Sequence, residues 1–148
     1  MGVQQAIYGL IFLLGFISIS IYHFRIRRQC IYLVKLTKPR AIILIVITLI
    51  FCSMAYIGGN LWYYYILALA GAISIISGVV SEGIHEKGIY YRGRKGLNIL
   101  AKWEDIKDIK IDTNKNKLHS FKLKTTRIYP GQYYRQEDIT EIKKFVEG

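Results

Sequence analysis

The side chains that could do acid/base or metal chemistry are few in this sequence, and their spacing disfavours both kinds of site. Glu104 and Asp105 are adjacent in a segment of strand character, where neighbouring side chains point to opposite faces, so they make a poor pair of catalytic carboxylates. His85 and His119 lie far apart, with no cysteine or second histidine at the spacing of zinc ligands. We therefore expect no catalytic site, no metal site and no enzyme activity.

The glycine-flanked and cysteine-containing segments add no other chemistry. Gly93–Gly96, "GRKG", is basic but lacks the longer glycine-rich pattern with a terminal Lys-Ser/Thr that cradles a phosphate. Cys30 and Cys52 fall in segments interpreted below as an inner loop and a membrane span, and a disulfide between them is not expected in a reducing cytoplasm. The prediction is two free thiols and no cofactor.

Charge divides the chain into two parts. Residues 1–81 contain six Lys/Arg and no Asp or Glu, whereas residues 82–148 contain fifteen Lys/Arg and all ten acidic residues. The six early cations all lie between Arg25 and Arg40, so that residues 1–24 and 41–81 carry no Asp, Glu, Lys or Arg. The two parts are predicted to face different solvents, as a membrane domain over 1–81 and a soluble domain over 82–148.

The uncharged stretches are long enough to cross a membrane. A helical span needs about 20 apolar residues, so the first stretch accommodates one span and the second accommodates two. Gly58, Gly59 and Asn60 break the second stretch, and Trp62–Tyr65 resemble the aromatic belt at a bilayer surface. We predict three transmembrane helices, at about 6–24, 41–58 and 62–80.

The predicted orientation follows from the cations. Short loops rich in Lys/Arg stay in the cytoplasm, which places the 25–40 loop and the tail from Glu82 inside, and the N-terminus and the Gly-Gly-Asn turn outside. The first span has no basic segment before it and no clear small-x-small site after it, so it is predicted to be an anchor and not a cleaved signal peptide.

Two features of the spans bear on function. Ala70, Ser74 and Gly78 recur at spacing four with Gly71 beside them, which makes a stripe of small residues on which another helix can pack closely. The contact could lie within one chain or between the chains of a homo-oligomer, and we favour packing within the chain. The interior of the predicted spans holds no acidic, basic or histidine side chain, which disfavours a transporter or channel component, because ion pathways usually need such groups.

The cations outside the spans are candidates for binding anionic lipid headgroups or a protein partner. The loop "HFRIRRQCIYLVKLTKPR" mixes them with apolar residues and could lie in the membrane interface, although it could equally be a topology signal alone. The tail carries a net charge of +5, from fifteen cations and ten anions, which could instead serve solubility. Nucleic acid is disfavoured, because a binding motif is lacking. The candidate residues are Arg25, Arg27, Arg28, Lys35, Lys38, Arg92, Arg94, Lys95, Lys122, Lys124 and Arg127.

The tail has the pattern of a small α+β domain. From Gly88 the apolar residues alternate with polar ones in "GIYYRG", "LNILAKW", "IKDIKID" and "LHSFKLK", which predicts strands, and "RQEDITEIKKFVEG" changes to the spacing of an amphipathic helix. We predict one antiparallel sheet of about four or five strands with a C-terminal helix on one face. The predicted core consists of Ile89, Trp103, Ile106, Ile109, Ile111, Phe121, Leu123, Ile142 and Phe145.

The tail also resembles a known family. "HEKGIYY", followed after a turn by "AKWEDIKDIKID", a Lys-rich strand and a terminal helix, is similar to the bacterial pleckstrin-homology-like (PH-like) domains that close many short membrane proteins of Gram-positive bacteria. Gly88-Ile89 matches the step that opens one strand of that pattern, and Trp103-x-x-Ile106 matches the step that begins another. A complete domain has about seven strands, and about 65 residues leave room for about five, so the resemblance implies a truncated PH-like domain.

These observations lead to a first hypothesis and two alternatives. The first is a non-enzymatic multi-span protein of a bacterial cell membrane, whose cytoplasmic PH-like module docks on anionic inner-leaflet lipid or on an unidentified protein partner as a scaffold or regulator. The second, which rests on resemblance, is an immunity protein that protects the producing cell against a membrane-active bacteriocin. The third is a small transporter or channel component, which the apolar spans disfavour.

Overall fold

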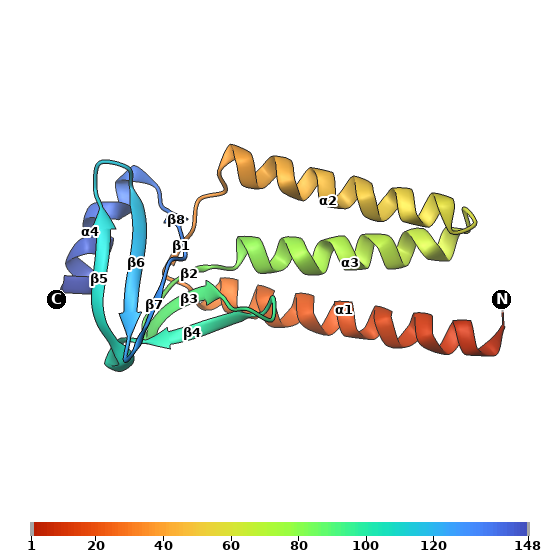
Figure 1. The fold of residues 1–148 in the computed structure, drawn as a ribbon, viewed down its shortest axis with the longest axis horizontal. Helices are drawn as coiled ribbons and strands as arrows, with labels where there is room; N and C mark the ends of the chain where they lie inside the picture. Colours follow the sequence, from red (N-terminus) through yellow and green to blue (C-terminus); the bar gives the residue numbers. More distant parts are fainter. Residues whose placement is uncertain (1, 148) are drawn as a thin grey trace.

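Three long helices lie side by side, and a tail of two antiparallel sheets and a C-terminal helix lies at one end of them (Figure 1). The computed structural model describes residues 2–147. The helices are α1 (Val3–Gln29), α2 (Lys38–Ile57) and α3 (Trp62–Val80). By length and composition, each of the three could cross a membrane, which confirms that part of the predicted fold class.

The first helix differs from the predicted span at both ends. It begins at Val3 and continues to Gln29, so Arg25, Arg27 and Arg28 lie on its last two turns and not in a loop. The sequence between His23 and Gln29 holds no glycine or proline to stop a helix, and the backbone becomes extended at Cys30. The basic residues therefore sit on a rigid helical extension that continues into the tail.

The middle of the three-helix bundle is occupied by α3, with α1 on one side of it and α2 on the other (Figure 1). Its buried residues are small: Ala68, Gly71, Ala72, Ser74, Ser77 and Gly78. A Cβ placed on Gly71 would lie 3.1 Å from Phe51 of α2 and 3.5 Å from Phe16 of α1, so this position holds both neighbours close. Ala70 is half-buried, and the contact stripe passes through Gly71 instead. The small residues pack helices of one chain together.

The first sheet, sheet A, draws a strand from the segment between the first two helices. Its order is β1 (Tyr32–Leu33), β2 (Gly83–His85), β3 (Gly88–Arg92) and β4 (Asn98–Lys102), all antiparallel. A Cβ on Gly83 would collide with the carbonyl oxygen of Tyr32, so the close pairing of β1 and β2 requires glycine there. Sheet A thus crosses the boundary that the sequence places at Ser81.

The second sheet, sheet B, follows a 3₁₀ turn, η1 (Trp103–Asp105). It contains β5 (Ile106–Asp112), β6 (Lys117–Leu123), β7 (Thr126–Ile128) and β8 (Gln132–Tyr133), with β7 and β8 both pairing with β6. Two sheets, with seven strands from residues 82–147, replace the predicted single sheet of four or five. The prediction missed β1, β2, β7 and β8, because strands of two or three residues are too short to show a two-residue period.

The tail core lies between the sheets and α4 (Gln136–Glu147). Of the predicted core residues, Ile89, Phe121 and Ile142 are fully buried, together with Ile84 and Leu118. Half-buried positions around this cluster are taken by Trp103, Ile106, Ile109, Ile111 and Leu123. Phe145 is not a core residue: 40% of it is exposed, because it lies near the end of α4 with its ring against that of Trp103 at the rim.

The segment after α1 packs on the tail. Tyr32 and Val34 contact the tail core, the Val34 N–H donates to the Glu82 carbonyl at 3.1 Å, and the Lys35 N–H donates to the Tyr133 carbonyl at 2.7 Å. Ile31 and Leu36 are exposed. Tyr32 and Val34 are therefore half-buried against the tail, which leaves less of their apolar surface for a membrane interface than the interfacial alternative expects.

Candidate functional site

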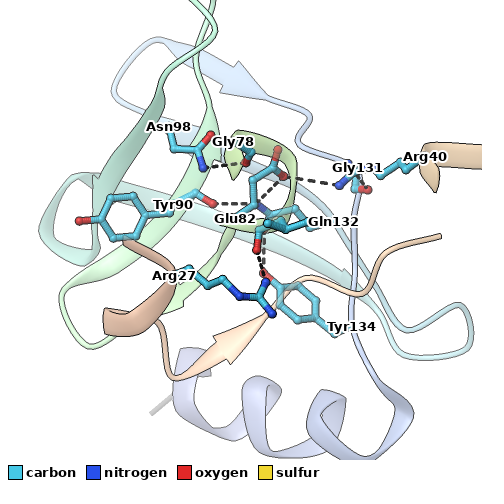
Figure 2. A network of polar contacts seen from close by, with 10 residues as sticks. Arg27, Arg40, Gly78, Glu82, Tyr90, Asn98, Gly131, Gln132 and Tyr134 are labelled. Carbon is cyan, nitrogen blue, oxygen red and sulfur yellow. Dashed lines mark hydrogen bonds and ion pairs between the residues drawn. The ribbon is translucent and has the colours of Figure 1, made fainter. Parts of the chain in front are cut away.

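The polar groups of the molecule concentrate where the three helices meet the tail. Two clusters of buried side chains lie there, one around His23 and one around Glu82 (Figure 2 draws the second with its neighbours). Each cluster joins a helix end to a strand of the tail. Together they determine how the tail is held against the bundle.

The first cluster, the His23 cluster, anchors the hairpin formed by β3 and β4. His23 is 1% exposed; its Nδ1 lies 3.1 Å from Ser77 Oγ, and its Nε2 lies 3.4 Å from the Asn98 backbone N–H. Ser77 Oγ donates to the Ser74 carbonyl, so it accepts from Nδ1, and Nε2 accepts from Asn98. These bonds assign a neutral imidazole with its proton on Nδ1.

Asn98, the first residue of β4, makes the remaining contacts of this cluster. Its Nδ2 donates to the Gly78 carbonyl at 2.9 Å, and its own carbonyl accepts from the Tyr22 hydroxyl at 2.9 Å. A Cβ on Gly78 would lie 3.1 Å from His23 Cε1, so glycine makes room for the ring against α3. The hairpin is thereby hydrogen-bonded to α1 and α3 at residues that precede the last residue of each helix.

The second cluster, the Glu82 cluster, joins α2 to both sheets. Glu82 is 4% exposed, and its Oε2 lies 3.7 Å from Arg40 Nη1 and 3.4 Å from Gln132 Nε2. Gln132 Nε2 also donates to the Tyr90 carbonyl at 2.8 Å, and the Tyr134 hydroxyl donates to Gln132 Oε1 at 2.8 Å (Figure 2). Every polar atom of the Gln132 amide is used, which binds β8 firmly to β3.

Burial dominates the electrostatics of this cluster. It raises the pKa of Glu82 above its ordinary value, although the positive charges of Arg40 and Arg92 and the hydrogen bond from Gln132 oppose the shift. Burial, with the nearby charge of Glu82, also raises the pKa of Tyr134 well above its usual range. The cluster therefore holds one carboxylate whose charge is costly and depends on pH.

The candidate cations do not form one surface. The β3–β4 turn, with Arg92, Arg94 and Lys95, lies beside α1, whereas the β6–β7 turn, with Lys122 and Lys124, lies at the opposite end of the tail near η1 (Figure 1). The structure therefore does not bring these residues and Arg127 together on one basic surface. Arg127 is occupied within sheet B, where it pairs with Asp108 at 2.7 Å and donates to Ser120 Oγ at 2.9 Å.

The candidate cations at the end of α1 and the start of α2 lie together at the end of the bundle next to the tail. Arg25, Arg27 and Arg28 are exposed on the last turns of α1, and the Arg27 guanidinium donates to the Val80 carbonyl at the end of α3. Lys35 precedes α2, and Lys38 is its first residue. Arg27 thus has a structural role in addition to its charge.

The histidines considered as metal ligands stay apart in the structure, and Glu104 and Asp105 lie on the 3₁₀ turn η1 and not on a strand as predicted. Among residues 2–147, no group of three or more His, Cys, Asp or Glu side chains lies close enough to hold a metal ion. His85 and His119 each lie edge-on against a tyrosine, Tyr90 and Tyr129 respectively. Burial raises the pKa of the Cys30 thiol to about 11, which makes its reactive thiolate scarce at neutral pH.

Comparison of the chain with known protein families, curated proteins and solved structures gives no match. The geometry described above therefore carries the functional argument by itself.

Sequence reasoning missed the residues that make the junction. His23 lies one position from the end of the predicted first span, outside the interior where histidine was considered, so its burial was not predicted. Glu82 offered a clearer signal, because it is the first acid after 81 residues without one and follows a span directly. Asn98 and Gln132 gave no signal, since a single amide in a short strand is unremarkable until its partners are known.

Proposed function

We propose that this chain is a non-enzymatic multi-span membrane protein whose tail lies on the cytoplasmic side and docks on the anionic inner leaflet. The observation that carries the proposal is the position of the β3–β4 turn beside the helical bundle. Asn98 is bonded to Tyr22, which lies seven residues before Gln29, the last residue of α1. Seven residues correspond to about 10 Å of helix, so the turn returns toward the part of α1 that would enter a membrane.

The surface of this turn has the chemistry of a membrane interface. Arg92, Arg94 and Lys95 are exposed, and beside them Leu97 and Ile99 are 39% and 46% exposed. Aliphatic side chains next to cations suit the boundary between headgroups and acyl chains. Each cation near an anionic membrane surface contributes on the order of 1 kcal/mol.

The proposed sidedness rests on the charge at the two ends of the bundle. Arg25, Arg27, Arg28, Lys35 and Lys38 lie at the end next to the tail, whereas the turn between α2 and α3 carries no charged residue. Positive charge in short loops marks the cytoplasmic side. This distribution supports a cytoplasmic tail.

We further propose that the tail is a PH-like module acting as a scaffold or regulator. In support, residues 82–147 form seven strands in two antiparallel sheets followed by a C-terminal helix, which is the strand number of a complete domain of that family and more than the five expected of a truncated one. Gly88-Ile89 opens β3, and Trp103 and Ile106 flank the turn into β5, as in the family pattern.

The test places an environment-sensitive fluorophore at the β3–β4 turn of the full chain. Lys95→Cys is labelled in a Cys30→Ser, Cys52→Ser background and reconstituted into vesicles of phosphatidylcholine with or without phosphatidylglycerol. We expect a blue-shifted emission that increases with the anionic lipid and falls with added salt. The same label at Thr125, in the β6–β7 turn, is the control and should report water in both vesicles.

Two paired variants separate charge at the turn from charge in general. Arg94→Gln with Lys95→Gln, read out from a label at Leu97→Cys, should lower the shift in anionic vesicles, whereas Lys122→Gln with Lys124→Gln should leave it unchanged. Emission from position 95 that matches position 125 in every vesicle would refute the docking. A shift at position 95 that is absent in both vesicles and appears only after a soluble extract is added would refute docking on lipid and favour a protein partner.

A further inference from the structure

A cavity of about 590 Å³ lies where the tail ends of α1, α2 and α3 meet the start of α4. Its charged lining comes from four different segments: Arg27 on α1, Lys35 before α2, Arg40 on α2, and Arg135 and Asp138 at the start of α4. Its volume is in the range of pockets that hold small ligands. We call it the basic cavity.

The protein neutralises the charge of the basic cavity only in part. Four cations face a single lining carboxylate, Asp138. Within residues 2–147, Arg40 is the lining cation that forms an ion pair, with Glu82 at 3.7 Å, and Lys35 and Arg135 form none. The Arg27 guanidinium donates to the Val80 carbonyl and keeps further N–H groups for another acceptor. The cavity can therefore accept an anion without losing an internal pair.

The rest of the lining is aliphatic, and a second cavity adjoins it. Ile31, Leu33, Val34, Leu36, Val79 and Val80 complete the basic cavity. A cavity of about 220 Å³ shares Arg40 and Val79 with it and is lined further by Ile43, Leu44, Ile47 and Ile75 of α2 and α3, with Glu82 and Arg92 at one end. We call this second cavity the α2–α3 groove. Cationic and aliphatic walls thus meet at Arg40.

We propose that these two cavities form a binding site for one anionic phospholipid. Its phosphate lies among Arg27, Lys35, Arg40 and Arg135, and one acyl chain follows Val79 into the α2–α3 groove. Guanidinium groups suit a phosphate because they offer paired N–H donors, and Lys35 adds a point charge. This inference rests on the proposed inner-leaflet position of the tail, but it adds a defined site of one lipid per chain, which surface docking by the β3–β4 turn does not require.

Native mass spectrometry of the full chain in detergent tests the site. The chain is titrated with phosphatidylglycerol, and in separate arms with phosphatidylcholine of the same acyl chains, glycerol phosphate and inorganic phosphate. We expect one phosphatidylglycerol per chain, weaker binding of phosphatidylcholine, and no competition from the two soluble phosphates. Lys35→Gln with Arg135→Gln should weaken phosphatidylglycerol binding about 30-fold, for two cations of about 1 kcal/mol each.

Lys122→Gln with Lys124→Gln removes the same charge at the β6–β7 turn and should leave binding unchanged. Thermal unfolding without lipid checks that both variants fold; if the double variant does not, Lys35→Gln alone should weaken binding roughly fivefold. Equal binding of both phospholipids, full competition by soluble phosphate, or no effect of either variant would overturn the proposal. Loss of defined binding with the fluorescence shift at Lys95 intact would leave surface docking in place and refute only this site.

Discussion

The tail has two ends of similar composition and different surroundings. Each end carries a basic turn and an Arg–carboxylate pair: Arg40–Glu82 near the β3–β4 turn, and Arg127–Asp108 near the β6–β7 turn. At the bundle end the carboxylate is buried, the pair is long at 3.7 Å, and the pKa of Glu82 is raised by burial. At the far end the pair is exposed and short at 2.7 Å, and the hydrogen bond from Arg127 lowers the pKa of Asp108.

The difference shows that surroundings decide what a charged pair does. A buried carboxylate loses hydration that a long ion pair only partly replaces, so the charged form of Glu82 is unfavourable in the folded protein. The position of its side chain is therefore fixed by the amide groups and helices around it. An exposed pair keeps its hydration and is screened by salt, so the pair of Asp108 and Arg127 on the surface of sheet B contributes little to the stability of the molecule. We therefore expect changes at the bundle end to affect the whole molecule and changes at the far end to have local effects.

The largest expected effect concerns the proposed sidedness. In the Cys30→Ser, Cys52→Ser background, Asn60→Cys in the turn between α2 and α3 should react with a membrane-impermeant maleimide added to intact cells, and Lys115→Cys in the β5–β6 turn should react after lysis. The reason is that the bundle end with the cations faces the cytoplasm. Labelling of position 115 in intact cells would invert the topology and remove the inner leaflet from the argument.

The next effect concerns the anchor of the β3–β4 hairpin. Asn98→Ala removes the bond from Nδ2 to the Gly78 carbonyl and should destabilise the junction by roughly 1–2 kcal/mol, the cost of a buried acceptor left unpaired. Chemical unfolding in detergent, followed by Trp103 fluorescence in a Trp62→Phe background, measures it. Asn114→Ala in the exposed β5–β6 turn is the matched control. If both variants unfold at the same denaturant concentration, the Asn98 contact does not hold the tail.

The pH dependence of stability should differ in sign between the two pairs. Because the pKa of Glu82 in the folded protein is above its ordinary 4.5, the stability it contributes is present below pH 4.5 and is lost as pH rises through the folded pKa. Because the pKa of Asp108 is below its ordinary 3.8, its contribution is present above pH 3.8 and is lost as pH falls through the folded pKa. Unfolding midpoints measured from acid to neutral pH report both contributions.

The two substitutions that isolate these slopes are Glu82→Gln and Asp108→Asn. Glu82→Gln should reduce the loss of stability as pH rises toward neutral and leave the loss at acid pH unchanged. Asp108→Asn should reduce the loss of stability at acid pH and leave the loss toward neutral pH unchanged. A decline toward neutral pH that survives Glu82→Gln would assign it to another group. Glu82→Gln keeps the shape of the side chain and its acceptor for Gln132, so the comparison measures charge.

The smallest effect is expected at the far end. Asp108→Asn removes the charge of the exposed pair and keeps the bond from Arg127 to Ser120, so at neutral pH and high salt it should not change the unfolding midpoint measurably, because screening already weakens the pair. The fluorescence shift of the label at Lys95 should also be unchanged. A loss of that shift would mean that the two ends of the tail are coupled, contrary to the comparison above.

Periodicity and charge predicted the regular parts of the fold. The absence of charged residues from 1–24 and 41–81 predicted three long helices, and the alternation in 106–112 and 118–124 predicted β5 and β6, since both patterns repeat along one element. The position of Gly71 between Phe16 and Phe51 was not predictable, because it depends on how α1 and α2 rotate around α3. The single-sheet prediction failed because β4 and β5, which follow one another in the chain, do not pair: η1 separates them and they belong to different sheets.

The sequence by itself determined which segments are apolar, which are basic, and which repeat with the period of a helix or of a strand, because these properties follow from residue types and their order. Only the tertiary structure decided that His23 and Asn98, 75 residues apart, share a hydrogen bond, that β1 joins the tail, and that the two basic turns lie at opposite ends. Contacts between distant segments depend on how whole elements pack, and the local sequence of a segment does not identify which distant segment it will contact.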